Sequence, residues 1–246
     1  MNFRYGIIGK NWAKKIYNIL VKMNKNAAVI DILSPSNFNS ENQFKENLFE
    51  EFKLLKNKFD IIWLAIPPKY QHFSTMLCLE NNINIIIEKP WMYNLIDTIP
   101  LINIQKEKNI HVGFNFEYLY LDELINFDFT LLKNKITFFE GYFRLNSFNS
   151  NIKAEHNLGS HLIAIRNYYF KKSFISKFEC NYKADNLRMF KIINGSNELL
   201  VDFTNNKQPI IQRLINDFEN KLSQNKKFNI NLEFASKIFE TIYNEL

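Results

Sequence analysis

Two short clusters of polar residues in this chain have the types and spacing needed for proton exchange. Glu88-Lys89-Pro90 directly follows the apolar run Ile83–Ile87, which is typical of a strand buried on both faces. An amine that is partly removed from water has its charged form disfavoured, so Lys89 can exchange a proton with a bound hydroxyl or carbonyl group. The second cluster is Asn157-Leu-Gly-Ser-His161, whose i, i+4 spacing places Asn157 and His161 on one face of a helix.

Each cluster also has a purely structural interpretation. Lys89 would then be a surface lysine at a strand end, Asn157 a helix N-cap and His161 a half-buried histidine. We favour the functional interpretation for Lys89 and His161. For Asn157 we favour the cap, although its amide remains a candidate for binding a substrate hydroxyl group; an amide cannot take a proton.

The stretch from Asp60 to Pro90 predicts how Lys89 is positioned. An apolar run to Ile66, the Pro67-Pro68 break, apolar residues at helical spacing and a second apolar run predict a strand, a helix and a strand. Such a unit is a right-handed crossover in a parallel sheet. Ligands of these sheets bind beyond the carboxyl ends of the strands, so Pro67-Pro68 and Glu88-Lys89-Pro90 are expected to line one cleft.

The N-terminal strand and turn contain part of the phosphate-binding sequence G-x-G-x-x-G. Gly6 and Gly9 are present, Ala13 can serve as the small residue for helix packing, and the middle glycine is absent. Backbone N–H groups of such a turn bind a pyrophosphate at the start of the next helix. The alternative is an ordinary strand–helix turn that binds nothing. The residues expected to contact a dinucleotide here are Gly6, Gly9, Lys10, Asn11, Trp12 and Ala13.

The end of the second strand carries the residue that contacts the adenosine ribose. An acid there favours NAD, and its absence leaves room for the 2′-phosphate of NADP. We expect this strand at 28–33, which places Ser34 at its end and favours NADP. If the strand ended earlier, Asp31 would be the contact residue and NAD the cofactor.

The order of strand, Pro-Pro, helix, strand and Glu-Lys-Pro resembles the glucose–fructose oxidoreductase / inositol dehydrogenase (Gfo/Idh/MocA) family of nicotinamide-dependent sugar dehydrogenases. The run His111–Tyr118 is similar to that family's sixth strand and following turn. The resemblance covers the first half of the chain and patches of the second. It implies an α/β protein with a Rossmann dinucleotide-binding domain at 1–115. A smaller, truncated α+β open-sheet domain for substrate and dimerisation would follow at 116–246.

The resemblance also implies roles for individual residues. Lys89 would lie beside the nicotinamide and the substrate hydroxyl. The family's Asp-x-x-x-His pattern falls on Asn157 and His161, so the histidine is kept and the acid is replaced. Glu117 and Tyr118 would face the substrate, and Leu119 stands where an arginine is often found. The residues implied beside the cofactor in the cleft are Pro67, Pro68, His72, Glu88, Lys89 and Pro90; His72 alternatively only begins a helix.

Composition narrows the function classes. The formal net charge is +6, but the basic residues are spread along the chain, so nucleic-acid binding is not expected. No stretch is long and apolar enough to span a bilayer, and the N-terminus runs straight into a strand, so no signal peptide is expected. Cys78 and Cys180 lack metal-ligand spacing, so we expect no metal and a reduced cytoplasmic protein.

These observations predict an NAD(P)-dependent oxidoreductase that transfers hydride to or from a sugar, a nucleotide-sugar or a similar small carbonyl or hydroxyl compound. NADP is preferred over NAD, and a homodimer is expected. Two alternatives remain. The missing glycine, Asn157 and Leu119 fit a non-catalytic Rossmann-fold binding or assembly module, and an imine-type reductase of the same family would share every motif.

Overall fold

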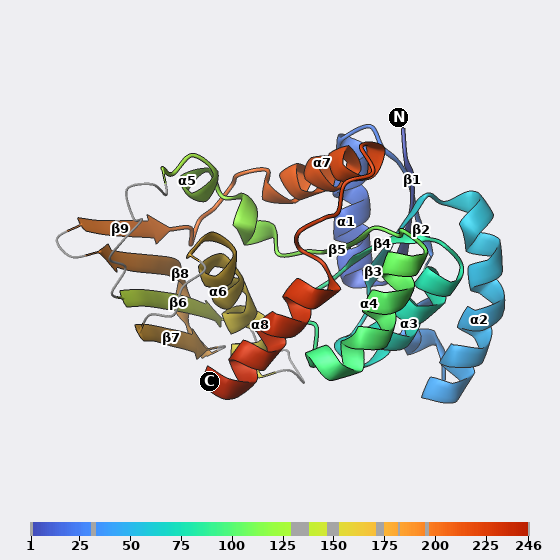
Figure 1. Ribbon diagram of the computed structural model, residues 1–246, viewed down its shortest axis with the longest axis horizontal. Helices are drawn as coiled ribbons and strands as arrows, with labels where there is room; N and C mark the ends of the chain where they lie inside the picture. Colours follow the sequence, from blue (N-terminus) through green and yellow to red (C-terminus); the bar gives the residue numbers. More distant parts are fainter. Residues whose placement is uncertain are drawn as a thin grey trace. The chain divides into compact units, whose positions relative to one another are not determined.

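The chain forms two compact units (Figure 1). The first unit comprises Met1–Asn115 and Ile211–Lys237, and the second comprises Phe116–Ile210 and Ile238–Leu246. This computed structural model describes residues 2–30, 33–128, 138–146, 153–170, 175–181, 183–194 and 197–245. No helix within these ranges is long and apolar enough to cross a membrane.

The first unit contains a five-stranded parallel sheet in the order β2-β1-β3-β4-β5. Its strands are β1 (Arg4–Gly9), β2 (Asn26–Ile30), β3 (Ile61–Ala65), β4 (Asn84–Ile87) and β5 (Val112–Phe114). The helical segments of this unit are α1 (Asn11–Lys22), η2 (Pro35–Asn37), α2 (Glu41–Lys58), α3 (Pro68–Glu80), α4 (Leu95–Glu107) and α7 (Ile210–Ser223), together with the start of α8 (Leu232–Glu245). The apolar runs of β1, β3 and β4 are buried because helices cover both faces of a parallel sheet.

The predicted crossover is confirmed. Strands β3 and β4 pair in parallel, and α3 connects them. Pro68 occupies the first turn of α3, where its missing N–H group leaves no intrahelical bond unmade. Asn94 caps the next helix, because its side chain accepts a hydrogen bond from the backbone N–H of Asp97 at 2.8 Å.

Residues 211–237 differ from the expectation of one uninterrupted second domain at 116–246, since they lie in the first unit. Phe218 and Phe228 pack edge to face with ring centroids 5.2 Å apart. A Cβ atom added to Gly113 would come within 2.9 Å of Phe218, so β5 needs glycine where these rings approach it. Glu219 of α7 accepts a hydrogen bond from the hydroxyl group of Tyr5 in β1 at 2.8 Å. The amphipathic helix thus buries its apolar face and this carboxylate against the Rossmann sheet.

The second unit contains a mixed four-stranded sheet in the order β7-β6-β8-β9, which confirms the predicted open-sheet α+β fold. Its strands are β6 (Phe138–Asn146), β7 (Ile175–Asn181), β8 (Lys183–Asn194) and β9 (Asn197–Asp202). The helical segments are η3 (Glu117–Tyr120), α5 (Asp122–Ile125), η5 (Glu155–Gly159), α6 (Ser160–Ile165) and η6 (Arg166–Phe170), of which η5 and η6 are π-helical.

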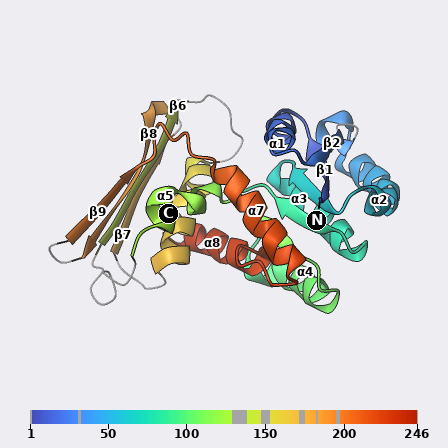
Figure 2. The same cartoon turned by 90° about the horizontal axis from the view of Figure 1, so that it is seen from above.

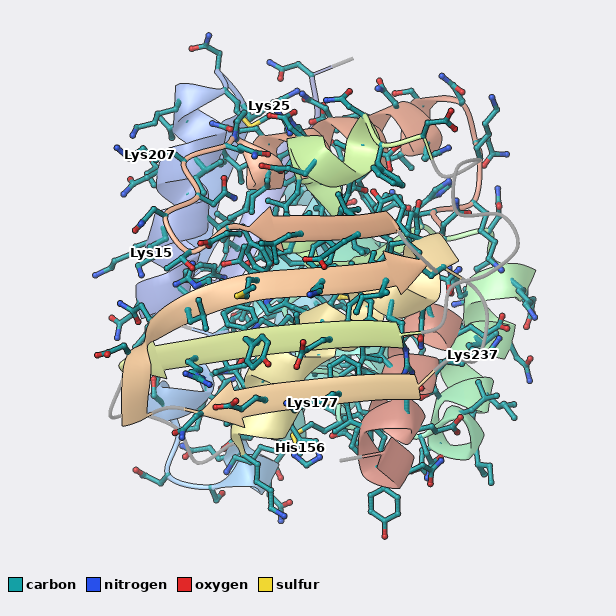
Figure 3. The ribbon with its side chains drawn as sticks, turned by 90° about the vertical axis from the view of Figure 1, so that its left-hand side faces the viewer. Lys15, Lys25, His156, Lys177, Lys207 and Lys237 are labelled. Carbon is teal, nitrogen blue, oxygen red and sulfur yellow. The ribbon has the colours of Figure 1, made fainter. Side chains whose placement is uncertain are left out.

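The two faces of this sheet differ in chemistry. Phe139, Phe143 and Phe190 point inward and are buried, as the two-residue alternation of a strand requires. In Figure 2 the described helical segments of this unit lie on one side of the sheet. Figure 3 looks onto the opposite face, where Lys177 forms an ion pair with Glu140 at 3.2 Å. Cross-strand charge pairs of this kind keep a sheet face hydrated.

Candidate functional site

The turn after β1 passes close to β3. Gly9 has a φ of 141°, and a Cβ atom there would lie 2.2 Å from the carbonyl oxygen of Ala65, so only glycine fits. Helix α1 then begins at Asn11 without a side-chain cap and without an acidic residue in its first turn. Its first N–H groups therefore need another acceptor, and the helix dipole favours an anion there.

Glu88 lies at the carboxyl end of β4 and is buried. Its Oε1 atom accepts hydrogen bonds from the indole N–H of Trp63 at 2.8 Å and from the amide of Asn115 at 2.9 Å. Burial raises the pKa of Glu88, while hydrogen bonds from Trp12, Trp63 and Asn115 and the charge of Lys89 act in the opposite direction. One carboxyl group therefore connects β3, the ends of β4 and β5, and the first turn of α1.

Gln71 is a buried polar residue at this sheet edge that the sequence analysis missed. Its Nε2 atom donates to the backbone carbonyls of Ile66 at 3.2 Å and Glu88 at 2.7 Å, which ties the start of α3 to the ends of β3 and β4. A polar residue on the buried face of α3 was the available signal. Within the described residues, Gln71 Oε1 and Asn115 Oδ1 are buried and have no hydrogen-bond partner. Both acceptors lie inside the protein at this edge, since Gln71 and Asn115 are fully buried.

Lys89 is half-buried, and Pro90 after it is buried. The positive charge of Lys89 lowers the pKa of the neighbouring Glu88 carboxyl group, as the smallest of the effects acting on it. His72 instead packs against the segment that follows Pro90. Its ring lies 4.8 Å from that of Tyr93, and its Nε2 atom lies 3.1 Å from the backbone carbonyl of Asp97. These contacts favour the structural interpretation of His72.

The predicted end of the second strand was wrong. The described part of β2 pairs from Asn26 to Ile30, and Leu33, where we expected the strand to end, is buried in a 3-10 turn outside the strand. Ser34 is buried, and its Oγ atom lies 3.1 Å from that of Ser36. The residue that follows Ile30 in the sequence is Asp31, which lies outside the described residues.

In the second unit, His161 of α6 is enclosed by aromatic rings. Its side chain is 2% exposed, and its ring centroid lies 4.6 Å from that of Tyr118 and 5.5 Å from that of Phe143. The Nε2 atom of His161 lies 3.9 Å from Oε1 of Glu117. Three of the predicted substrate-side residues, Glu117, Tyr118 and His161, therefore form one cluster.

An arginine completes this cluster from a different element than expected. Leu119 is buried, but Arg188 of β8 donates to the hydroxyl group of Tyr118 at 3.0 Å, and its guanidinium group lies 5.5 Å over the ring of Phe143. Burial, and then the nearby Glu117 carboxylate, raise the pKa of Tyr118 to about 12. The signal in the sequence was a basic residue in phase with the buried Phe190 of the same strand.

Asn157 lies inside the π-helical turn η5, so its interpretation as a helix N-cap was wrong. Its backbone carbonyl accepts a hydrogen bond from the Ser160 hydroxyl group at 3.0 Å. A π-helical turn inside a helix often marks a functional segment, and this one leads directly into His161. Among the described residues, no group of three His, Cys, Asp or Glu side chains could hold a metal ion.

Comparison with known proteins agrees with the fold. Residues 3–116 match the family model GFO_IDH_MocA, described as "Oxidoreductase family, NAD-binding Rossmann fold". No curated protein sequence matches the chain. Among solved structures, UDP-N-acetylglucosamine 3-dehydrogenase GnnA from Acidithiobacillus ferrooxidans is similar with a TM-score of 0.81 and 11% identity, over 99% of this chain and 96% of that one.

Two further solved structures share the fold. Myo-inositol 2-dehydrogenase from Lactobacillus plantarum has a TM-score of 0.75 and 12% identity, over 99% of this chain and 96% of that chain. GenD2 from gentamicin A biosynthesis, in complex with NAD, has a TM-score of 0.77 and 10% identity, over 98% of this chain and 92% of that chain. The alignments span nearly the whole of these chains. Compared with them, the second unit therefore does not show the truncation that we expected.

Proposed function

We propose that this chain, whose residues 3–116 match the model of the Gfo/Idh/MocA oxidoreductase family, transfers hydride between a nicotinamide dinucleotide and a sugar, a nucleotide-sugar or a similar small hydroxyl or carbonyl compound. The observation that carries the proposal is the Glu88 carboxyl group. It is buried at the carboxyl end of β4, is held by Trp63 and Asn115, and precedes Lys89. These hydrogen bonds fix the carboxyl end of β4, which carries Lys89, the amine proposed to exchange a proton with the substrate.

The residues present fit a dinucleotide. The uncapped N–H groups of Asn11, Trp12 and Ala13 would hold the pyrophosphate, with Gly6 and Gly9 allowing the close turn and Lys10 adding positive charge. Pro67, Pro68 and Pro90 would shape a cleft for the nicotinamide beyond the ends of the strands. When bound, a nicotinamide ring supplies or accepts the hydride.

For the choice of cofactor, two comparisons support NAD: the matching family model is described as NAD-binding, and the solved structure of GenD2 is in complex with NAD. An acid near the end of the second strand hydrogen-bonds the ribose hydroxyl groups, and Asp31 is the candidate in this sequence. Ser34, which carried the expectation of NADP, is buried and close to Ser36 instead. NAD is therefore the proposed cofactor, and NADP the alternative.

The proton is assigned to Lys89 and His161. Lys89 would take the proton of a substrate hydroxyl group during oxidation and return it during reduction. Within the second unit, His161 is the proposed acid–base group, and Glu117, Tyr118 and Asn157 are the proposed groups for binding substrate hydroxyl groups. The half-buried position of Lys89 supports its role, because partial desolvation makes loss of the ammonium proton easier.

A panel of sugars, inositols and nucleotide-sugars, followed at the absorbance of reduced nicotinamide, tests the proposal. Lys89→Ala should lower kcat by about a hundredfold or more while the Kd for NADH stays within about twofold. Lys22→Ala, at the exposed end of α1, is the matched control and should leave both unchanged. Turnover of imines alone would favour the imine-type reductase. Absence of dinucleotide binding at millimolar concentration would favour the non-catalytic module.

A further inference from the structure

We propose that Glu117 is the positioning residue for His161, supplying the carboxylate that Asn157 cannot provide. The consequence for catalysis rests on the proposed function, whereas the pairing of the two side chains does not. In this arrangement the acid partner of the histidine comes from η3, the segment after β5, and not from the preceding turn of the histidine's own helix.

The distance and the burial of the two groups carry this inference. His161 Nε2 and Glu117 Oε1 are 3.9 Å apart, which is within ion-pair range once the imidazole is protonated but beyond hydrogen-bond length. The side chains of His161 and Glu117 are only 2% and 11% exposed. Water and salt therefore screen the interaction weakly, and the carboxylate acts strongly on the proton affinity of the ring.

The aromatic neighbours fix the direction of the imidazole. The ring of Tyr118 meets it edge to face at 4.6 Å, the ring of Phe116 does so at 6.2 Å, and Phe143 lies at 5.5 Å. These contacts come from the segment that carries Glu117 and from the sheet. Because rings on several sides hold the imidazole plane, its Nε2 atom stays directed toward the Glu117 carboxylate.

The described charged and titratable groups near His161, other than Glu117, contact partners of their own. Tyr118 is neutral at ordinary pH, its pKa is raised further to about 12 by burial, and its hydroxyl group accepts from Arg188 of β8. The guanidinium charge of Arg188 lies over the ring of Phe143. On the helix itself, His156 stacks on Phe239 at 6.0 Å and so faces a different neighbour.

Asn157 cannot replace Glu117 in this role. An amide carries no charge and cannot stabilise an imidazolium ion as a carboxylate does. Removal of the Glu117 charge should therefore change the proton affinity of His161, and a new carboxylate at position 157 should restore part of it. The near-isosteric Glu117→Gln variant keeps the packing of the side chain and removes only its charge. A change in the proton affinity of His161 in this variant therefore indicates an electrostatic role.

The test uses the full-length chain labelled with ¹³C-histidine, with the His161 resonance assigned by its loss in His161→Gln. The pH midpoint of the His161 ring titration should fall in Glu117→Gln and recover in part in Glu117→Gln/Asn157→Asp. Glu123→Gln is the matched control, since Glu123 follows in α5 and bonds Gln208 at 2.9 Å; its variant should leave the midpoint unchanged. An unchanged midpoint in Glu117→Gln would overturn the proposal.

Two further measurements keep the result decisive. Unchanged titrations of His72, His111 and His156 show that the variant is folded. Should Glu117→Gln fail to fold, Glu117→Asp, which shortens the side chain by one methylene, must shift the His161 midpoint, and an unchanged midpoint there overturns the proposal. An NADH titration of the same samples separates the two claims: a Glu117-dependent midpoint without NADH binding refutes only the proposed function, and NADH binding with a Glu117-independent midpoint refutes only the pairing.

Discussion

The indole N–H group of Trp63 donates to the buried carboxyl group of Glu88 at 2.8 Å, across the paired strands β3 and β4. Asn115, directly after β5, donates to the same oxygen at 2.9 Å. Removing the indole donor while keeping an aromatic ring tests how much this contact stabilises the strand ends. Trp63→Phe should lower the free energy of unfolding by about 2–4 kcal/mol, from one lost hydrogen bond and a partly filled cavity. Urea denaturation measures the change.

Glu88→Gln should change the dependence of stability on pH. Burial raises the pKa of Glu88 in the folded chain above its ordinary value of 4.5. The folded state therefore binds more protons, so the stability from this group is complete below the unfolded pKa and is lost as pH rises through the folded pKa. The stability of the natural chain relative to Glu88→Gln should fall as pH is raised from about 4 to 8. Urea midpoints at several pH values test this, and a constant difference would contradict it.

Gly9→Ala tests the close approach of the first turn to β3. The φ of 141° and the 2.2 Å distance from an added Cβ atom to the carbonyl oxygen of Ala65 both exclude a side chain. The variant should lose about 2–4 kcal/mol of unfolding free energy. Gly6→Ala is the comparison, because its added Cβ atom would meet only the ends of side chains such as Ile62 Cδ1 at 2.7 Å. A smaller loss for Gly9→Ala than for Gly6→Ala would contradict the observed turn.

Tyr5→Phe tests whether α7 is held on the first unit. The Tyr5 hydroxyl group donates to Glu219 at 2.8 Å, and Lys25 pairs with the same carboxylate at 2.5 Å. Loss of one hydrogen bond to a buried carboxylate should cost about 1.5–3 kcal/mol. Tyr243→Phe removes a hydroxyl group from a residue that is 79% exposed and should change stability by less than about 0.5 kcal/mol. Equal effects of the two variants would mean that the Tyr5–Glu219 contact does not form in solution.

The choice between NAD and NADP gives a prediction for Asp31. We expect NADH to bind about tenfold or more tightly than NADPH, and Asp31→Ser to reduce or reverse that ratio, since the acid repels a 2′-phosphate. Ser34→Ala should leave the ratio unchanged, because Ser34 is buried beside Ser36. Competition titrations with both nucleotides measure the ratio. A change in Ser34→Ala without one in Asp31→Ser would restore the expectation of NADP.

Local patterns in the sequence were sufficient for the Rossmann half of the fold. The apolar runs, the Pro67-Pro68 break and the cluster at Lys89 are signals within a few residues of each other, and β3, α3 and β4 formed where those signals indicated. Strand β2 was drawn too long because Leu33 is apolar and buried without being paired. Buried residues are apolar whether or not they pair with a neighbouring strand. The pattern of apolar residues alone therefore cannot show where a strand ends.

Contacts between distant segments could not be predicted. Arg188 reaches Tyr118, and α7 returns to pack beside β5, through pairings that no local pattern encodes. The sequence analysis named His72 and not its neighbour Gln71, because histidine side chains commonly exchange protons and amide side chains do not. Its buried position in α3 and its two carbonyl partners identify it as the residue that joins the strand ends.

The account depends most directly on whether the turn after β1 binds a dinucleotide. The decisive measurement is a fluorescence titration of the purified full-length chain with NADH, followed by energy transfer from the chain's tryptophans to the reduced nicotinamide. The account predicts saturable binding with a Kd in the micromolar range. The same titration of Gly9→Ala, at a temperature where that variant is folded, should show binding weakened by about tenfold or more. Absence of saturation in the natural chain up to millimolar NADH would contradict it.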